Sequence, residues 1–135
     1  MSSTFSRPFL SIVVPAYNEE ERLVASIGKI EAYLDAAGID AEILVVDDGS
    51  KDRTAELAAK ALVGRRGRVL RNGDNRGKGY SVRHGVAEAR GRFVLLTDAD
   101  LSTPIEEHAK LAAVIRDRDL DVVIGSRALP DSDVQ

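Results

Sequence analysis

Residues 94–104 read VLLTDADLSTP and have the pattern of a strand, an acidic turn and a helix start in immediate succession. The apolar residues at the beginning are typical of a strand in a sheet that is covered on both faces. Thr103, followed three residues later by Glu106, matches the capping box that begins a helix. The stretch therefore predicts a strand, loop and helix unit whose loop carries Asp98 and Asp100.

Short apolar runs of the same kind recur along the chain, and each is followed by a polar loop and a longer segment of helical period. Such runs indicate buried strands, because a sheet with both faces covered has apolar side chains on both. The five expected strands are Leu10–Val14, Ile43–Val46, Arg68–Leu70, Phe93–Leu96 and Val122–Ile124.

Four helices are expected between these strands. The second begins after Ser50 as its N-cap, and the fourth begins after Thr103. The third spans about Tyr80–Ala89 and is interrupted by Gly85. The first spans about 18 residues and has one apolar stripe for the core. The stripe consists of Leu23, Ile27, Ile30 and Leu34.

This order of elements predicts one α/β domain over the 135 residues. Strand, helix, strand crossovers of this length build a doubly wound, mainly parallel sheet with helices on both faces. The core is expected from about residue 9 to residue 127, and residues 130–135 form a polar tail.

The composition excludes several kinds of site. The chain has no cysteine, so disulfides and thiolate metal sites are excluded and any metal would be bound by oxygen. Only His84 and His108 are present, and structural roles are expected for both. The net charge of -3 and the 4% of aromatic residues argue against nucleic-acid binding, although basic residues cluster between positions 65 and 78. No apolar run exceeds five residues, whereas about 20 span a bilayer.

Ligands of doubly wound sheets bind at the carboxyl ends of the strands, so the segments after the strands are the candidates for a site. These segments are Pro15–Glu20, Asp47–Ser50, Asn72–Gly79, Asp98–Asp100 and Gly125–Arg127.

Two pairs of aspartates follow strands at this edge. Four gathered carboxylates repel one another unless they are solvated, meet hydrogen-bond donors or bind a cation. Asp98 and Asp100 lie about 7 Å apart between Cα atoms in an extended segment and point the same way, which suits Mg²⁺ or Mn²⁺. Thr103 already caps the next helix, so this pair has no capping role to fill. For Asp47 and Asp48 a purely structural role in a turn remains an equal alternative.

The loop NGDNRGKG, residues 72–79, combines flexible glycines with Arg76 and Lys78. Its backbone amides and cations could bind phosphate. The spacing fits neither a Walker A loop nor a dinucleotide-binding fingerprint. A solvated loop without a ligand is the alternative interpretation, and an acidic metal pair beside the loop favours a diphosphate held from two sides.

Four segments, in this order and separated by helices, resemble the motifs of family-2 glycosyltransferases of the GT-A fold. The subset that the chain resembles most is the polyprenyl-phosphate sugar synthases, such as dolichyl-phosphate mannose and glucose synthases. The resemblance extends from about Leu10 to Arg127. The four segments are Val14–Glu19, Val46–Ser50, Asn75–Gly79 and Asp98–Asp100.

The resemblance implies a Rossmann-like nucleotide-sugar-binding half and assigns roles to particular residues. Asp98 and Asp100 would bind a divalent cation, Mg²⁺ or Mn²⁺, that bridges the donor diphosphate, and Asp100 and Arg127 would be catalytic. The substrate-binding residues would be Pro15, Ala16, Tyr17, Glu19, Asp47, Asp48, Gly49, Arg76, Lys78, Asp98 and Ala99.

The same resemblance implies an inverting transfer of a hexose from a nucleoside-diphosphate sugar, UDP-glucose or GDP-mannose, to a polyprenyl phosphate. We expect the protein to be located in the cytoplasm or at the cytoplasmic face of a membrane. Ser102 favours the glucosyl type. The chain stops at Gln135, where family members continue into the acceptor-binding half, so we expect donor binding more firmly than turnover.

Two alternatives stay open on the sequence alone. The chain could be a sugar-nucleotide-binding module that works with further chain or a partner. A receiver-type, Mg²⁺-binding signalling domain has a similar length, but its paired acids should follow the first strand, where Pro15, Ala16 and Tyr17 stand instead. The oligomeric state is not predicted.

Overall fold

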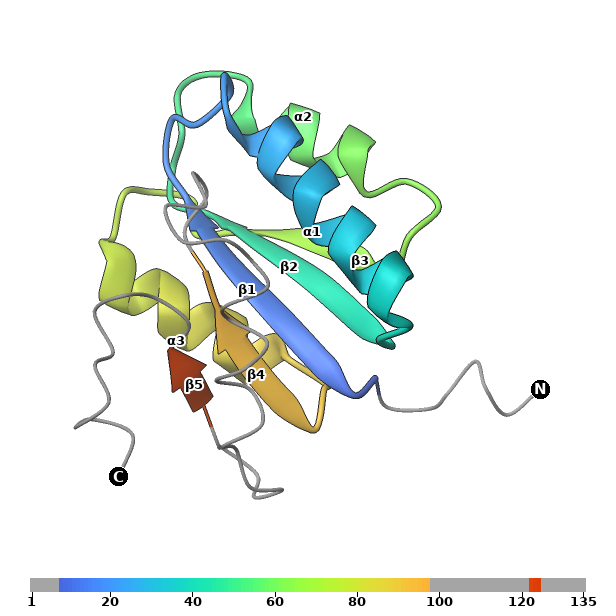
Figure 1. The fold of residues 1–135 in the computed structure, drawn as a ribbon. Helices are drawn as coiled ribbons and strands as arrows, with labels where there is room; N and C mark the ends of the chain where they lie inside the picture. The colour runs from blue at the N-terminus through green and yellow to red at the C-terminus, as the bar shows by residue number, and fades with distance from the viewer. Residues whose placement is uncertain (1–7, 98–121, 125–135) are drawn as a thin grey trace.

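The computed structural model describes residues 8–97 and 122–124. Its centre is a five-stranded sheet in the order β3-β2-β1-β4-β5, in which every pair of neighbours is parallel (Figure 1). The elements are β1 (Leu10–Ala16), α1 (Leu23–Ala37), β2 (Ala41–Asp47), α2 (Thr54–Ala61), β3 (Gly67–Arg71), α3 (Lys78–Glu88), β4 (Phe93–Leu96) and β5 (Val122–Ile124).

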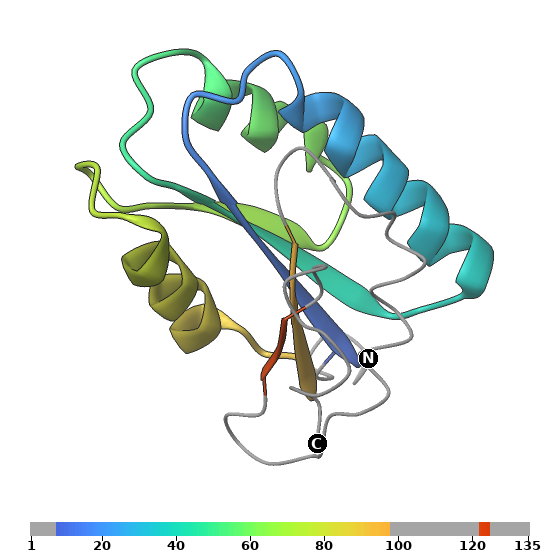
Figure 2. The ribbon, with the colours of Figure 1, turned by 60° about the vertical axis from the view of Figure 1, so that its left-hand side comes forward.

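Helices cover both faces of the sheet. Figure 2 shows α1 and α2 together on one side and α3 on the other. The chain winds from β1 outward to β3 and then returns to place β4 on the other side of β1. The winding direction therefore reverses between β1 and β4, and the predicted doubly wound parallel sheet is confirmed.

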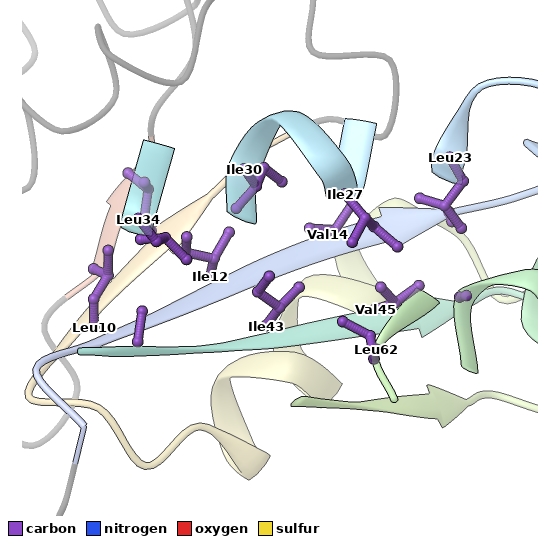
Figure 3. Close-up of a cluster of buried hydrophobic side chains, with 14 residues drawn as sticks. Leu10, Ile12, Val14, Leu23, Ile27, Ile30, Leu34, Ile43, Val45 and Leu62 are labelled. Carbon is purple, nitrogen blue, oxygen red and sulfur yellow. The ribbon is translucent and has the colours of Figure 1, made fainter. Parts of the chain in front are cut away.

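The larger core lies between the sheet and the α1 and α2 helices (Figure 3). The four side chains of the predicted α1 stripe are all buried in it, so that prediction is confirmed. The helix has 15 residues, somewhat fewer than expected, because Gly38 ends it in the left-handed conformation at φ 68°. The stripe meets alternate residues of the strands, among them Ile12, Val14, Ile43 and Val45.

The smaller core lies between the sheet and α3, and Gly85 determines how closely they approach. A Cβ atom at this glycine would lie 2.4 Å from Cγ1 of Val13 and 3.2 Å from Cγ2 of Val46. The glycine therefore allows α3 to contact β1 and β2 directly. The expectation that Gly85 interrupts the helix was wrong, since α3 continues from Lys78 to Glu88.

The second helix begins later than expected. Its N-cap is Arg53, and the predicted cap Ser50 instead accepts a hydrogen bond from the amide of Asn18 at 2.8 Å. Asp52 accepts the amide N–H of Thr54 at 2.9 Å and thereby serves the first turn of α2. The predicted fourth helix, from Thr103, lies outside the described residues.

A buried carboxylate joins the strands at their amino ends. Glu42 of β2 is 4% exposed and accepts the Ser11 hydroxyl at 2.5 Å and the amide N–H of Arg90 at 2.7 Å. The amide of Gly91 donates to Ser11 Oγ at 2.7 Å, and a Cβ at Gly91 would lie 2.6 Å from the Ser11 nitrogen. This network binds the turn after α3 to the beginning of β1 and β2.

Among residues 8–97 and 122–124, no helix has the length and apolar character needed to cross a membrane.

Candidate functional site

Three loops meet at the carboxyl edge of the sheet: residues 17–22 after β1, 48–53 after β2 and 72–77 after β3. The β4 strand runs parallel to β1 and reaches the same edge. The described residues end there at Thr97. Four predicted site residues therefore lie outside the described residues, and their roles remain predictions. They are Asp98, Ala99, Asp100 and Arg127.

The loops after β1 and β2 are joined by reciprocal hydrogen bonds. The Asn18 amide donates to Ser50 Oγ at 2.8 Å, and the Lys51 amide donates to Asn18 Oδ1 at 2.9 Å. Asn18 has a positive φ of 52°, a conformation that asparagine tolerates better than most residues. The Asn18 side chain thus fixes both loops in one arrangement.

A second set of contacts continues this joint toward the two helices. The Glu19 amide donates to Thr54 Oγ1 at 2.8 Å, and the Glu20 amide donates to Asp52 Oδ2 at 3.2 Å. Burial raises the pKa of Asp52, but the donors on Thr54 and Glu20 lower it more, so its pKa lies below 3.8. Asp52 is therefore an ionised structural group.

The adjacent aspartates Asp47 and Asp48 have different partners. Asp47 is 2% exposed, accepts the Ser50 amide at 3.3 Å and lies 3.9 Å from Nε of Arg71. Its main-chain oxygen accepts the amide of Asn72 at 2.9 Å. Asp47 therefore organises its own turn and the end of β3.

Asp48 binds the loop between β3 and α3. Its side chain, in a residue 6% exposed, accepts the amides of Arg76 at 2.7 Å and Gly77 at 3.0 Å and the Asn72 side-chain amide at 2.8 Å. Burial raises the pKa of Asp48, but these donors outweigh it and keep the pKa below 3.8. The backbone amides of this loop were candidates for phosphate binding. In the structure the amides of Arg76 and Gly77 donate to the Asp48 carboxylate instead.

Gly49 allows the two loops to touch. It has φ 78°, and a Cβ there would lie 2.6 Å from the Asn75 nitrogen and 2.6 Å from the Asp74 carbonyl carbon. A glycine is required for the conformation and for the contact alike. The fold therefore requires a glycine at position 49, independently of any ligand.

Other predicted residues form the exposed part of this edge. Tyr17 is 42% exposed, and Lys78 is exposed as the first residue of α3. The Arg76 guanidinium carbon lies 5.2 Å from the ring centre of Tyr80, which is 38% exposed. The edge therefore presents aromatic rings and cations together.

Three further predicted residues lie at the end of β1 and in the loop that follows it. Ala16 is buried, its carbonyl accepts the Asp48 amide at 2.9 Å, and Pro15 before it is half-buried. The carboxylate of Glu19 accepts Nη2 of Arg22 at 2.7 Å. Every predicted residue that the structure describes thus lies in or next to the three loops.

Sequence reasoning did not single out Asn72, although it is the first residue after β3. Its side chain donates to Asp48 Oδ1 and to Ser81 Oγ, both at 2.8 Å, and its Oδ1 lies 2.8 Å from Nδ1 of His84. The available signal was position: a polar side chain directly after a strand at the binding edge.

The described part of the chain contains no group of three His, Asp or Glu side chains that could hold a metal ion. The Thr97 hydroxyl is buried and has no hydrogen-bond partner within the structure as described. It lies at the end of β4, one residue before the predicted metal ligand Asp98.

The basic cluster seen in the sequence is largely paired with acids. Its pairs are Arg65 with Glu31 at 3.1 Å and with Asp35 at 2.9 Å, Arg66 with Asp40 at 3.3 Å, and Arg68 with Glu88 at 3.4 Å. These arginines therefore lie among carboxylates, which reduces their attraction for a polyanion.

Comparison with known proteins adds to this geometry. The model of the family "Glycosyl transferase family 2" matches residues 11–134. Dolichyl-phosphate beta-glucosyltransferase of Drosophila melanogaster is 40% identical over 137 residues, which cover 92% of this chain and 42% of that protein. The chain therefore spans about two fifths of this relative's length.

Two solved structures have a similar fold. A mannosyltransferase of Pyrobaculum calidifontis in complex with GDP-Man and Mn²⁺ gives a TM-score of 0.60 at 26% identity, covering 70% of this chain and 28% of that one. Glucosyl-3-phosphoglycerate synthase of Mycobacterium tuberculosis, in complex with Mn²⁺, UDP and phosphoglyceric acid, gives 0.57 at 28%, covering 73% and 34%. The predicted GT-A fold is confirmed, and the chain belongs to glycosyl transferase family 2.

Proposed function

We propose that this chain is the donor-binding part of an inverting, metal-dependent glycosyltransferase. It binds a nucleoside-diphosphate sugar at the carboxyl edge of its sheet, and the complete enzyme transfers the hexose to a polyprenyl phosphate. The acceptor is a membrane lipid, so the reaction takes place at a membrane surface, and we assign it to the cytoplasmic face.

One observation carries this proposal: three loops of the carboxyl edge are locked together and present exposed rings and cations. Asn18 joins the loops through exposed hydrogen bonds, and Asp48 joins them through half-buried ones. The joined loops expose Tyr17 and Arg76, and Lys78 is exposed at the start of α3. A rigid edge with an aromatic ring and two cations suits a base and a diphosphate.

The relatives support the choice of substrates. The matched fly protein is named for glucosyl transfer to dolichyl phosphate, and the two similar structures contain GDP-Man or UDP with Mn²⁺. Ser102 in DADLSTP favours glucose over mannose, so UDP-glucose is the donor that we assign first.

A divalent cation fits the residues available at this edge. Asp98 and Asp100 follow β4, and two carboxylates with water and phosphate oxygens satisfy Mg²⁺ or Mn²⁺. The buried Thr97 hydroxyl, which has no hydrogen-bond partner in the structure as described, supports a polar ligand near this strand end. When bound, the cation would neutralise negative charge on the departing nucleoside diphosphate.

The chain's own residues then account for donor binding. Arg76 and Lys78 would face the diphosphate, Tyr17 would contact the nucleoside, and Arg127 would meet a phosphate of donor or acceptor. A polyprenyl phosphate is already an anion, so direct attack of its oxygen on the sugar C1 needs little help from a general base. Such a displacement inverts the anomeric centre.

A second candidate keeps the binding but omits the turnover. The chain spans 42% of the fly relative, so a sugar-nucleotide-binding module that works with further chain is the specific alternative. Both candidates predict donor binding, and only the first predicts transfer by the complete protein.

Calorimetric titration of UDP-glucose and GDP-mannose, each with Mn²⁺, Mg²⁺ or EDTA, tests the proposal. We expect UDP-glucose to bind with metal and to lose most of its affinity in EDTA. A folded sample that binds neither nucleotide in any of these conditions would overturn the donor site.

Asp100→Ala tests the metal ligand, and Asp74→Ala is its matched control, an exposed aspartate in the loop after β3. We expect metal dependence to disappear in the first variant and to remain in the second. Unaltered metal dependence in Asp100→Ala would mean that the ion is bound elsewhere.

A further inference from the structure

A chain of polar side chains links β2, β3 and α3 around the loop of residues 72–77. Asn72 is its centre, because both protons of its side-chain nitrogen and its side-chain oxygen are engaged. The nitrogen donates to Asp48 and Ser81, and the oxygen faces His84. Ser81 also donates to the carbonyl of Gly77 at 3.2 Å, which ties the start of α3 into the same network.

The chemistry fixes the orientation of the Asn72 amide. The carboxylate of Asp48 is ionised and accepts hydrogen bonds only, so the NH₂ group of Asn72 must point toward it. The amide oxygen therefore points toward His84. A flipped amide would place two acceptors against each other and break the contact with Asp48.

The same reasoning fixes the tautomer of His84. Its Nδ1 lies 2.8 Å from Asn72 Oδ1, which can only accept, so Nδ1 must carry a proton whether the ring is neutral or charged. A neutral His84 is then the Nδ1–H tautomer. The Nδ1–H of His84 thus donates to the Asn72 oxygen when the amide has the orientation that Asp48 requires.

The network determines where the loop lies relative to the rest of the edge. Asp48 accepts the amides of Arg76 and Gly77, and the next residue, Lys78, begins α3. We propose that Asn72, oriented by His84 through its Nδ1–H, is a positioning residue for donor binding. It holds the loop so that Arg76 and Lys78 face the donor; the inference rests on the proposed function only in this last step.

Asn72→Asp tests the proposal, and Asn75→Asp is its matched control. Each adds one negative charge to the same loop, but only Asn72 donates to the Asp48 carboxylate, whereas Asn75 is exposed and donates to the Asp48 main-chain oxygen at 3.4 Å. We expect Asn72→Asp to speed hydrogen exchange at the Arg76 and Gly77 amides and to weaken UDP-glucose binding, each by about tenfold or more. Asn75→Asp should change each by less than about threefold. Equal effects of the two variants would overturn the proposal.

His84 provides a spectroscopic test and a rescue. Two-bond proton–nitrogen correlation spectra of the wild-type chain should show the Nδ1–H tautomer of the neutral ring, which free histidine does not favour. His84→Asn keeps an N–H donor near the place of Nδ1 and should retain the amide protection, whereas His84→Leu should lose it. An Nε2–H tautomer, or equal protection in the two variants, would contradict the role of His84.

The two proposals fail in different ways. If the wild-type chain bound no nucleotide, the proposed function would fail, and the exchange and tautomer measurements, which need no ligand, would still decide whether Asn72 and His84 position the loop. If nucleotide bound equally well to Asn72→Asp and Asn75→Asp, the positioning role in donor binding would fail and the donor site would stand.

Discussion

At each end of β2 a buried carboxylate accepts main-chain amides, but we assign the two carboxylates different roles. Glu42 near its beginning is a buried carboxylate that accepts the amide of Arg90, directly after α3 and its C-cap. Asp48, directly after β2, is a buried carboxylate that accepts the amides of Arg76 and Gly77, just before α3. Carboxylates in and directly after β2 thus bind the segments on both sides of α3.

Both edges expose cations, Arg90 and Arg92 at the amino edge and Arg76 and Lys78 at the carboxyl edge, but the surroundings of these cations differ. At the amino edge the turn is short, Gly91 has no room for a side chain, and the rings of Phe9 and Phe93 pack edge to face at 4.8 Å. At the carboxyl edge Arg76 lies in a loop that Asp48 joins to the end of β2, and Lys78 begins α3. Because ligands of such sheets bind at the carboxyl ends of the strands, we infer that the amino end serves stability alone, whereas the carboxyl end serves stability and donor binding.

Asp48→Ala should have the largest effect, because it leaves three donors without their charged acceptor. We expect the free energy of unfolding to fall by about 3 kcal/mol and donor affinity to fall more than about tenfold. Urea denaturation and calorimetric titration measure the two quantities. Unchanged donor affinity in a folded Asp48→Ala sample would break the comparison between the two ends.

Glu42→Ala should lower the free energy of unfolding by about 2 kcal/mol, since the Ser11 hydroxyl and the Arg90 amide lose a buried acceptor. Donor affinity of the folded variant should stay within about twofold of wild type, because the site lies at the opposite edge. Glu31→Ala is the control: Glu31 pairs with Arg65 near the surface, and its loss should cost less than about 1 kcal/mol. A Glu42 variant that loses donor affinity as strongly as the Asp48 variant would contradict the division of roles.

Gly85→Ala should destabilise the chain by about 1.5 kcal/mol, although alanine favours helices, because its methyl group would overlap Val13. The matched control is Gly79→Ala in the same helix, where the nearest neighbour of a Cβ is Arg83 Nη1 at 3.7 Å. Thermal melts should show a loss for the first variant and no loss for the second. Equal melting temperatures would mean that α3 can move away from the sheet at no cost.

The pH dependence of Asp48 gives the smallest effect. Its pKa is lowered below 3.8 in the folded chain, so its charge contributes stability that is fully present above that value and is lost as the pH falls through the lower folded pKa. The difference in stability between wild type and Asp48→Asn should therefore be constant near neutral pH and shrink in acid. A difference that persisted unchanged down to about pH 2 would contradict the assignment.

Most of the fold followed from periodicity. The short apolar runs predicted the five strands of the described sheet, and the spacing of Leu23, Ile27, Ile30 and Leu34 predicted the buried side of α1. Local turn chemistry was harder to interpret. Serine is a common N-cap residue, but Ser50 accepts a hydrogen bond from Asn18 in the loop after β1. The two residues are 32 positions apart in the sequence and become neighbours only in the folded chain.

The site was predictable as a set of strand ends but not as a network. The rule that ligands bind at the carboxyl edge selected Tyr17, Asp48 and Arg76, which the structure places at that edge. It could not show that Asp48 binds the amides of Arg76 and Gly77, because that contact joins residues separated by 28 and 29 positions. For the same reason the sequence could not show that Asn72 contacts Asp48 and His84.

Amide chemical-shift mapping with UDP-glucose, in Mn²⁺-free buffer with Mg²⁺ and then with EDTA, tests the central claim most directly. We predict Mg²⁺-dependent shifts at the carboxyl edge, at Tyr17, Gly77 and Lys78, and none at the amino edge, at Arg90 and Gly91. Shifts at the amino edge, or no shifts in a folded sample, would contradict the assignment of this edge as the donor site.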